Sequence, residues 1–410
     1  MKKIIRFTAG TLACVLAVLL SFLLYISSSL PEKYMVNKGE KLNIRSRFGV
    51  TAAVKNKNTV NQVLTQRGNI YKTQLKFLGV IPLKEVTVEL VEKQMVAACG
   101  TPFGIKMFTE GVMVVGLSDL DTAVGSVNPA KDAGIRTGDV ITRIGGKEVY
   151  SNEQVGEIVS ASGGKPLKVL LKRKNTPTTV LLTPAKGSVD GCYKAGMWVR
   201  DSSAGIGTMT FYDPVSGVFG GLGHAVCDVD TGEILPLMSG EAVSVDITGC
   251  IKGETGKPGE LQGSFYNERK LGSLYLNTQT GVYGTLNKEL TPPKLYEISM
   301  RQEVKASKAT ILTTLYGNLP REYDIMIEKV SFTDGNPTKN MVIRVTDPEL
   351  LAKTGGIIQG MSGSPILQDG KLVGAVTHVF VNDPTRGFGI FAENMYYSID
   401  NVENAISAVG

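Results

Sequence analysis

The stretch Gly355-Gly356-Ile357-Ile358-Gln359-Gly360-Met361-Ser362-Gly363-Ser364-Pro365-Ile366 is a glycine-dense turn that leads into an apolar strand. After Gly370 the chain returns as a second strand over residues 373–379. Glycine has no Cβ, so backbone N–H groups at such a turn can converge beside a serine hydroxyl and stabilise a neighbouring oxyanion. The stretch therefore predicts a nucleophilic Ser362, with the amides of Gly360 and Ser362 as an oxyanion hole.

Glycine-serine turns also occur as plain hairpins, and Ser364 is a rival nucleophile two residues further on. The G-M-S-G-S-P sequence resembles the G-D-S-G-G-P loop of chymotrypsin-like serine proteases. Together with the return strand, the later segment 387–391 resembles the second barrel of those enzymes. The resemblance favours Ser362, because glycine follows the nucleophile in that pattern.

A serine hydroxyl needs a general base within hydrogen-bond reach. The chain has only two histidines, His224 and His378. His224 lies in a glycine-rich turn far ahead of Ser362, where the resemblance places the histidine of the first barrel. We therefore expect His224 to be the base, and His378 to line the substrate cleft or pack on the return strand. Two histidines exclude a three-histidine zinc site, and we predict no metal and no organic cofactor.

The composition indicates a globular chain of two or three domains. The chain has 410 residues, of which 42% are hydrophobic, and domains average about 150 residues. Glycine supplies 47 residues, and Val, Ile and Thr are abundant, so we expect a mainly β fold. The net charge is 44 − 38 = +6, but the basic residues are scattered along the chain, which argues against a nucleic-acid partner.

The N-terminus is typical of an export segment. Lys2, Lys3 and Arg6 precede an uncharged, mostly apolar stretch over residues 7–30. We favour a retained membrane anchor over a cleaved signal peptide, and either one would place the residues after Pro31 outside the cytoplasm. Five cysteines without a C-x-x-C pair exclude a metal knuckle, whereas disulfides and free thiols both stay open.

A second motif precedes the histidine. Residues 111–115, 128–135 and 138–141 resemble a PDZ domain of the circularly rearranged kind found in exported bacterial proteases. PDZ domains bind an extended peptide at a sheet edge. The resemblance implies that backbone N–H groups of Phe103, Gly104 and Ile105 hold the peptide carboxylate, with Val155 and Val159 of a helix as the opposite wall. The alternative is that these residues only form the domain core.

The combined pattern resembles the stage IV sporulation protein B peptidases of endospore-forming bacteria. The resemblance rests on the anchor, the PDZ motif, Gly223-His224-Ala225, Val345-Thr346-Asp347-Pro348 and the G-M-S-G-S-P turn, in this order. It implies a triad of His224, Asp347 and Ser362.

The aspartate is the uncertain member of that triad. The aspartate of chymotrypsin comes from the first barrel, so Asp347 either orients His224 from another direction or supports its own loop through an Asp-Pro turn. Asp228, Asp230 and Asp246 are alternatives from the first barrel.

These features predict a mainly β chain: an anchor or signal over 1–31, a tether and strand segment over 32–98, a PDZ domain over 99–186 and a chymotrypsin-like double-barrel protease domain over 187–410. The resemblance implies an exported sporulation-signalling serine endopeptidase between the forespore and mother-cell membranes. Such a protease would cleave itself in the tether between about residues 38 and 75. It would also cut an extracytoplasmic part of a regulatory membrane protein, which triggers processing of a pro-sigma factor. The alternatives are a PDZ scaffold with an inactive protease-like domain and a general quality-control protease.

Overall fold

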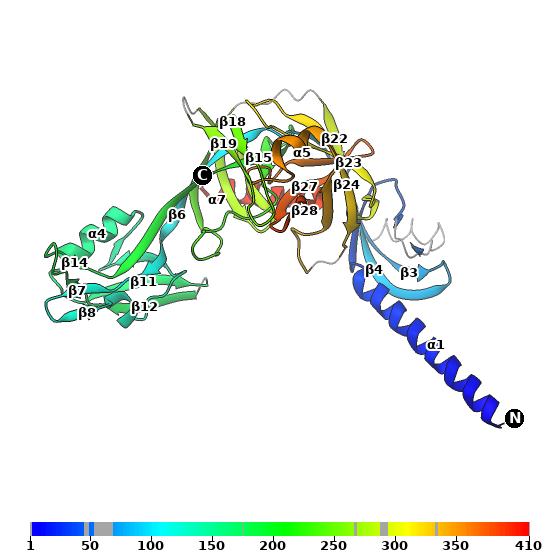
Figure 1. The fold of residues 1–410 in the computed structure, drawn as a ribbon, viewed down its shortest axis with the longest axis horizontal. Helices are drawn as coiled ribbons and strands as arrows, with labels where there is room; N and C mark the ends of the chain where they lie inside the picture. Colours follow the sequence, from blue (N-terminus) through cyan, green and yellow to red (C-terminus); the bar gives the residue numbers. More distant parts are fainter. Residues whose placement is uncertain are drawn as a thin grey trace.

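The computed structural model describes residues 2–44, 49–52, 69–174, 176–265, 269–287, 294–332 and 335–409. The molecule is elongated (Figure 1): helix α1 projects from one end, a group of strands around helix α4 lies at the other, and two β-barrels lie between them. Strands outnumber helices throughout the described residues, as a mainly β sequence predicts.

Helix α1, Lys2–Ser29, carries the apolar N-terminal segment. Its stretch Gly10–Ser29 has 20 residues and a mean hydropathy of 2.3, and only 6% of it is buried in the molecule. A helix of this length, at a rise of ~1.5 Å per residue, reaches the ~30 Å of a bilayer core. The helix is therefore long and apolar enough to be a membrane anchor, and a signal sequence has the same properties.

A four-stranded sheet in the order β1-β4-β3-β2 follows α1 and covers its last turns, where Ile26 and Leu30 are buried. The tether predicted between about residues 38 and 75 lies partly outside the described residues, and its described part contains β2 and the start of β3. The strands are β1 Lys33–Asn37, β2 Val50–Ala52, β3 Ile70–Phe77 and β4 Ile81–Val91.

Six strands close the first barrel, in the order β6-β15-β16-β21-β20-β17 and back to β6. Its core is apolar and includes Phe103 and Phe219, whose rings meet edge to face with centroids 5.7 Å apart. The strands are β6 Pro102–Leu117, β15 Met197–Tyr212, β16 Val218–Gly221, β17 Leu237–Val243, β20 Lys270–Thr278 and β21 Gly281–Leu286.

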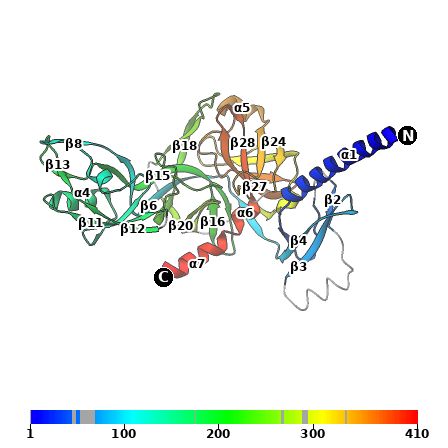
Figure 2. The same ribbon diagram turned by 90° about the horizontal axis from the view of Figure 1, so that it is seen from below.

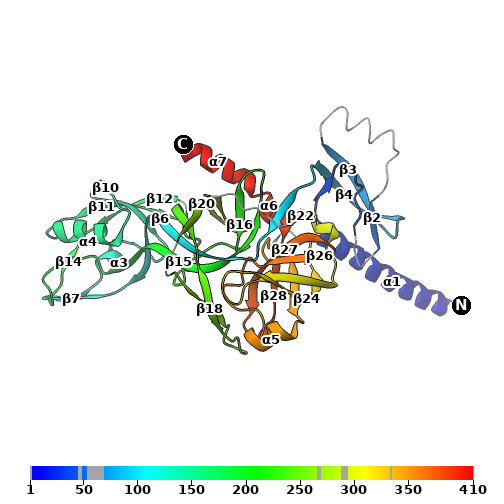
Figure 3. The same cartoon turned by 90° about the horizontal axis from the view of Figure 1, so that it is seen from above.

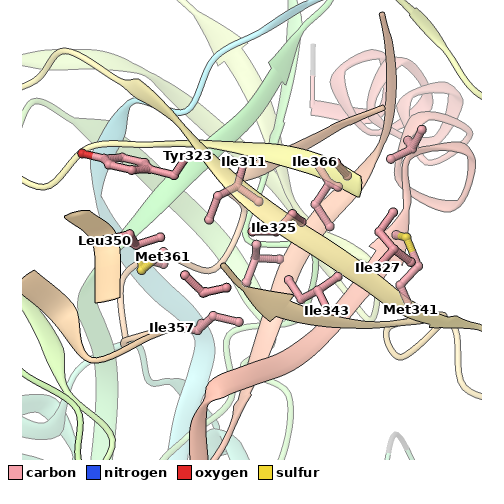
Figure 4. Packing of buried hydrophobic residues seen from close by; sticks show 14 of the residues in the cluster. Ile311, Tyr323, Ile325, Ile327, Met341, Ile343, Leu350, Ile357, Met361 and Ile366 are labelled. Atoms are coloured by element: carbon pink, nitrogen blue, oxygen red, sulfur yellow. The ribbon is translucent and has the colours of Figure 1, made fainter. Parts of the chain in front are cut away.

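Six further strands close the second barrel, in the order β23-β24-β25-β28-β27-β26 and back to β23. Side chains alternate along these strands, so that Tyr323, Ile325 and Ile327 of β24 all point into the core shown in Figure 4. The strands are β23 Lys308–Thr313, β24 Arg321–Val330, β25 Met341–Val345, β26 Pro365–Gln368, β27 Lys371–Phe380 and β28 Asp383–Phe391.

Short elements hold the two barrels together. Strand β5, Met95–Ala98, pairs with β15 of the first barrel and with β22, Leu295–Ile298, which in turn pairs with β27 of the second. After the second barrel, helices α6, Ala392–Tyr396, and α7, Ile399–Val409, lead back to the first (Figures 2 and 3). The double-barrel architecture predicted from the sequence is confirmed.

The PDZ strands lie at the far end of β6 and β15. The core there includes Val155 and Val159, and Asn128 and Ser151 cap the two helices through their side chains. The elements are β7 Leu120–Thr122, β8 Gly125–Val127, α3 Pro129–Asp132, β9 Val140–Ile144, β10 Lys147–Glu148, α4 Asn152–Ala161, β11 Leu167–Arg173, β12 Thr176–Leu182, β13 Ala185–Lys186 and β14 Tyr193–Lys194.

Strands β6 and β15 belong to both regions. In β6, Phe103 and Ile105 pack in the first barrel, whereas Val112 and Val114 pack in the PDZ core. Strand β15 pairs with β6 along both halves. The chain therefore passes between barrel and PDZ domain within continuous strands, although the sequence placed the PDZ limits at residues 99 and 186.

All five cysteines, which the sequence left open between disulfides and thiols, are free. Cys99 is enclosed in the first barrel, and this burial raises the pKa of its thiol to about 12. A neutral thiol of this kind acts as a small apolar side chain.

Candidate active site

A cavity of about 440 Å³ opens between the two barrels and brings His224 and Ser362 to one place. The first barrel supplies residues 203–206 of β15 and the segment after β16, and the second supplies the turn before β26 and the end of β27. No charged side chain lines it among the described residues. The lining residues are Ile105, Ser203, Ala204, Gly205, Ile206, Leu222, His224, Ala225, Val226, Cys227, Pro258, Ile358, Gln359, Gly360, Ser362, Thr377, His378, Val379 and Val381.

His224 follows a tight turn at the end of β16. Leu222 and Gly223 both have positive φ angles, 66° and 71°. A Cβ on Gly223 would lie 2.9 Å from the side chain of Ile390 and 3.0 Å from that of Thr377. Glycine therefore lets the turn approach the second barrel and present the imidazole to the cavity.

The His224 ring has one nitrogen engaged by the backbone. Its Nδ1 lies 2.7 Å from the carbonyl oxygen of Ala225. We assign the N–H to Nδ1, since the carbonyl can only accept, and this leaves Nε2 as a proton acceptor. Burial lowers the pKa of His224, and the bond to Ala225 opposes this only in part. The ring is therefore held neutral, as a general base requires.

The nucleophile turn is fixed to the second barrel by Met361. Its side chain is fully buried with Leu350, Ile357 and Ile366 (Figure 4). On either side, Gly360 and Gly363 have φ angles of 91° and 95°. The buried methionine between two left-handed glycines turns Ser362 outward to the cavity.

The backbone amides of this turn show where an oxyanion would bind. From Gly355 to Ser364 every N–H donates a hydrogen bond within the described part of the chain, except those of Gly360 and Ser362. Unpaired backbone N–H groups are rare in folded proteins. Both predicted oxyanion-hole amides are thus free to bind an anion.

The Ser362 hydroxyl does not contact His224 in this structure. Its Oγ donates a hydrogen bond of 2.8 Å to the carbonyl oxygen of Thr377. Because the serine and His224 line the same cavity, a rotation about the Ser362 Cα–Cβ bond redirects the hydroxyl into that shared space. In this structure the Ser362 hydroxyl therefore has a resting position on the backbone of β27.

Ser364, the rival nucleophile, is fully buried, and its Oγ has no hydrogen-bond partner in the part of the chain that the structure describes. It is absent from the cavity lining. Thr208, which sequence reasoning missed, supports the turn instead: its Oγ1 donates to the Gly360 carbonyl at 2.8 Å, and its N–H donates to the Ser362 carbonyl at 3.0 Å. A threonine inside a strand carries no sequence signal for such a role.

The structure does not bring Asp347 to His224, so this part of the implied triad needs correction. Asp347 is the N-cap of helix α5, Pro348–Thr354, and its Oδ1 accepts a hydrogen bond of 3.0 Å from the Leu350 N–H. Its Oδ2 faces the N–H of Asp324 at 3.4 Å. The carboxylate is used by backbone donors of α5 and of β24, which matches the alternative of a structural Asp-Pro turn.

The other candidate aspartates do not reach His224 either. Asp228 is buried, forms an ion pair with Arg200, and accepts from the N–H groups of Asp230 and Thr231. Asp230 pairs with the same arginine. Asp246 is exposed at the start of β18, Asp246–Ile251. The only partner of the His224 Nδ1 among the described residues is the Ala225 carbonyl.

His378 lies closer to the base than sequence reasoning predicted. Its ring centroid is 4.9 Å from that of His224, with 37° between the planes. The Nδ1 of His378 is buried without a hydrogen-bond partner. Burial, followed by repulsion from Lys339 and from His224 whenever that ring is protonated, lowers the pKa of His378 to about 4. His378 is therefore a neutral ring against His224, which lines the cleft as expected.

The predicted peptide-binding residues of the PDZ domain need correction too. Phe103, Gly104 and Ile105 lie inside β6, which pairs with β15 on one side and β17 on the other. A strand paired on both sides has no N–H groups left for a carboxylate. Val155 and Val159 are buried in the PDZ core, the alternative that the sequence left open.

Comparison with known proteins identifies the family of the chain. The SpoIVB peptidase S55 family matches residues 191–396, half of the chain. The chain belongs to the SpoIVB peptidase S55 family. The PDZ domain family matches residues 121–173. This S55 family member therefore carries a PDZ domain together with its peptidase-family region.

Individual relatives are more distant. A curated protein of Lactococcus lactis, the putative zinc metalloprotease LL2128, is 30% identical to this chain over 120 residues. The match covers 28% of this chain and 25% of LL2128, so the chain spans about a quarter of the length of this relative. The Rv3671c protease of M. tuberculosis in its active form has a TM-score of 0.27 and 12% identity, covering 49% of this chain and 74% of its own. A PDZ domain of the SdrC-like protein Lmo2051 from Listeria monocytogenes has a TM-score of 0.18 and 20% identity, covering 22% and 87%.

Proposed function

We propose that Ser362 is the nucleophile, His224 the general base, and the amides of Gly360 and Ser362 the oxyanion hole of this endopeptidase. One observation carries the proposal: from Gly355 to Ser364, the only two N–H groups without a partner among the described residues flank Met361. They lie beside a serine that shares its cavity with His224, whose pKa is lowered by burial. A hairpin with a purely structural role would not require two unpaired amides, a serine and a histidine at one cavity.

The reaction would proceed through an acyl-enzyme. The Ser362 oxygen attacks the scissile carbonyl carbon while its proton passes to His224 Nε2, and the carbonyl oxygen becomes an anion bound by the two free amides. The imidazolium then gives the proton to the leaving amine. A water molecule then attacks the acyl carbon while His224 takes a proton from it. His224 returns this proton to the Ser362 oxygen, the acyl group leaves as the carboxylic acid product, and the serine is free again.

Substrate binding would release the resting serine. Residues 377–379 of β27 line the cavity, and the Thr377 carbonyl holds the Ser362 hydroxyl at 2.8 Å. A substrate backbone N–H that bonds to this carbonyl would replace the hydroxyl and leave it available to His224. With no charged lining residue, the cavity suits an uncharged substrate side chain.

We further propose that the chain is an exported sporulation-signalling protease, anchored by α1, that cleaves itself near its N-terminus and cuts an extracytoplasmic part of a regulatory membrane protein. Membership of the S55 family and the apolar helix support this role. The proposed self-cleavage range of about 38–75 lies partly outside the described residues.

For the PDZ domain we propose limits inside the shared strands, from about Gly111 to about Asp201. Its peptide groove would lie between Met197–Arg200 of β15 and helix α4. These residues pair with β6 on one edge, and no strand covers the other among the described residues. Helix α4 lies against β14 and β15, and the Asn152 N–H donates to the Asp201 carboxylate at 3.0 Å. An open strand edge beside a helix is what peptide addition requires.

The test compares Ser362→Ala with Ser364→Ala in the full chain. We expect Ser362→Ala to lose self-cleavage by about 10^6-fold with its fold intact, and Ser364→Ala to retain it. Expression of Ser362→Ala in an endospore-forming cell should also block pro-sigma-factor processing. Self-cleavage by Ser362→Ala at the parental rate would leave a PDZ scaffold, and normal processing with a dead enzyme would favour a general quality-control protease.

A further inference from the structure

The turn between β3 and β4 presents an apolar surface beside the N-terminal helix. Residues 77–81 read Phe-Leu-Gly-Val-Ile and carry no charge. Leu78 is 67% exposed and Val80 is 77% exposed. Isolated surface hydrophobics are common, but Leu78 and Val80 are separated only by Gly79 and occupy the tip of a hairpin.

This turn lies alongside α1 rather than beyond its end. The ring of Phe77 meets that of Phe22 edge to face, with centroids 6.1 Å apart. Phe22 is two turns before Ser29, the last residue of α1, which places it about 10 Å back along the helix axis. Figure 1 shows β3 and β4 beside the C-terminal end of α1.

The strand register explains this placement. Strand β1 leaves α1 and runs parallel to β4, with Lys33 opposite Thr87. Strand β4 begins earlier, at Ile81, so its first residues extend roughly 20 Å back past the start of β1. The Lys84 amine also donates to the Leu30 carbonyl at 2.5 Å, which ties the hairpin to the end of the helix.

The apolar stretch of α1 begins at Gly10 and ends at Ser29, and its length equals the ~30 Å of hydrocarbon in a bilayer. A neighbour of Phe22 therefore lies at the level of the acyl chains near one face. We propose that the β3–β4 turn inserts its apolar tip into the outer face of the membrane that α1 crosses. This proposal rests on the proposed anchor role of α1.

The turn is suited to a lipid environment. The Leu78 N–H donates to the Gly49 carbonyl at 2.9 Å, and the Val80 N–H donates to the Phe77 carbonyl at 3.1 Å. Backbone groups that bond internally do not oppose entry into a low-dielectric medium. Lys76 follows the apolar tip on β3, where its amine can meet anionic lipid headgroups.

Site-specific tryptophans test this insertion. The single native tryptophan, Trp198, is replaced by Trp198→Phe in the full chain. Into this background we introduce Val80→Trp at the turn, Phe22→Trp in the helix, or Val124→Trp at an equally exposed position of the PDZ hairpin, which is 90% exposed. Each protein is reconstituted into phosphatidylcholine–phosphatidylglycerol vesicles, with or without acyl chains brominated near the headgroup.

Brominated lipid should quench Val80→Trp and Phe22→Trp and leave Val124→Trp unchanged. Quenching of Phe22→Trp alone would overturn the insertion and keep the anchor. If Phe22→Trp is not quenched either, the anchor itself fails, and the insertion fails with it. A blue-shifted but unquenched Val80→Trp would show that protein covers the turn, which also contradicts the proposal.

Discussion

At His224, the main-chain carbonyl of Ala225 contacts the ring Nδ1 at 2.7 Å, the position that a carboxylate takes in a Ser-His-Asp triad. The Ala225 carbonyl can fix the tautomer of the ring, but it carries no charge to stabilise an imidazolium. The neighbouring His378 adds no such charge, because its own pKa is lowered to about 4. The imidazole therefore stays neutral down to mildly acidic pH.

The neutral state of His224 predicts how kcat/KM decreases at acidic pH. His224 must be neutral to accept the serine proton, and burial lowers the pKa of His224 below its usual 6.5. The apparent pKa of the acid limb of kcat/KM should therefore lie below 6.5, with activity lost as the pH falls through it. An acid limb with an apparent pKa above 6.5 would show that a negative charge reaches His224 during catalysis.

The stability of the folded state should also depend on the protonation of His224 and His378, and it should decrease as the pH falls. Both folded-state pKa values lie below the unfolded value of 6.5, so the unfolded chain binds more protons at low pH. The folded state therefore loses stability as the pH falls below about 6.5 and, for His378, stops losing it below about 4.

Substitutions of Asp347 distinguish a helix-capping role of this aspartate from a catalytic role. Replacement by alanine removes the acceptor of the Leu350 N–H and should cost about 1 kcal/mol of stability, whereas asparagine retains a capping oxygen and should cost less. Thermal unfolding of both variants checks this. Asp347→Asn should keep most of its peptidase activity; a ~10^4-fold fall in kcat at unchanged stability would instead place Asp347 in the triad.

At the scale of the elements, the nucleophile turn depends on glycine where the two barrels touch. A Cβ on Gly363 would lie 2.0 Å from the Thr208 carbonyl oxygen and 2.6 Å from the Leu222 nitrogen. Gly363→Ala should therefore displace the turn, abolish activity and cost more than about 2 kcal/mol. The measurements are self-cleavage and thermal unfolding.

Gly156 is the matched control. It lies in helix α4, and a Cβ there would meet nothing within 4 Å. Gly156→Ala should stabilise the protein by about 0.5–1 kcal/mol, because alanine has the higher helix propensity. Equal effects of the two substitutions would argue against a close contact at Gly363.

Sequence reasoning succeeded where a local pattern fixes the element. The glycine turn around Ser362, the PDZ motif over residues 128–135 and the apolar N-terminal segment all have local signals, and the structure contains each of them. It failed at Phe103, Gly104 and Ile105, because strand pairing decides whether such a segment is a loop, and their partners in β15 and β17 lie about a hundred or more residues away.

In the candidate site, too, local patterns are visible in the sequence and contacts between distant segments are not. Glycines surround both His224 and Ser362, which is why the sequence singles them out; the cavity is lined by both, and their catalytic roles stay a prediction. The resting bond from Ser362 to Thr377 and the contact between His224 and His378 depend on the packing of two barrels, for which no short-range pattern exists.

At the scale of the whole molecule, Glu297 connects three parts of the chain. Its carboxylate accepts from Asn37 of the N-terminal sheet at 3.0 Å, pairs with Lys93, and accepts from Lys371 of the second barrel at 2.8 Å. Burial acts to raise the pKa of Glu297, but the bonds from Lys371 and Lys93 outweigh it and lower the pKa. The sheet next to α1 is thereby linked to the protease domain.

Removal of this carboxylate should loosen the sheet. Glu297→Ala should cost about 1–3 kcal/mol, because the buried Asn37 amide loses its acceptor, and limited proteolysis at residues 92–94 should become faster. Glu85→Ala removes an exposed ion pair with Lys72 and should change stability by less than about 0.5 kcal/mol. Equal protease sensitivity of the two variants would contradict this role of Glu297.

The most direct measurement is the position of the covalent adduct formed by a serine-directed phosphonate, read by mass spectrometry of the full chain. The account predicts a single adduct on Ser362 that His224→Ala abolishes while the fold persists. An adduct on Ser364, or none on a chain that still cleaves itself, would contradict it.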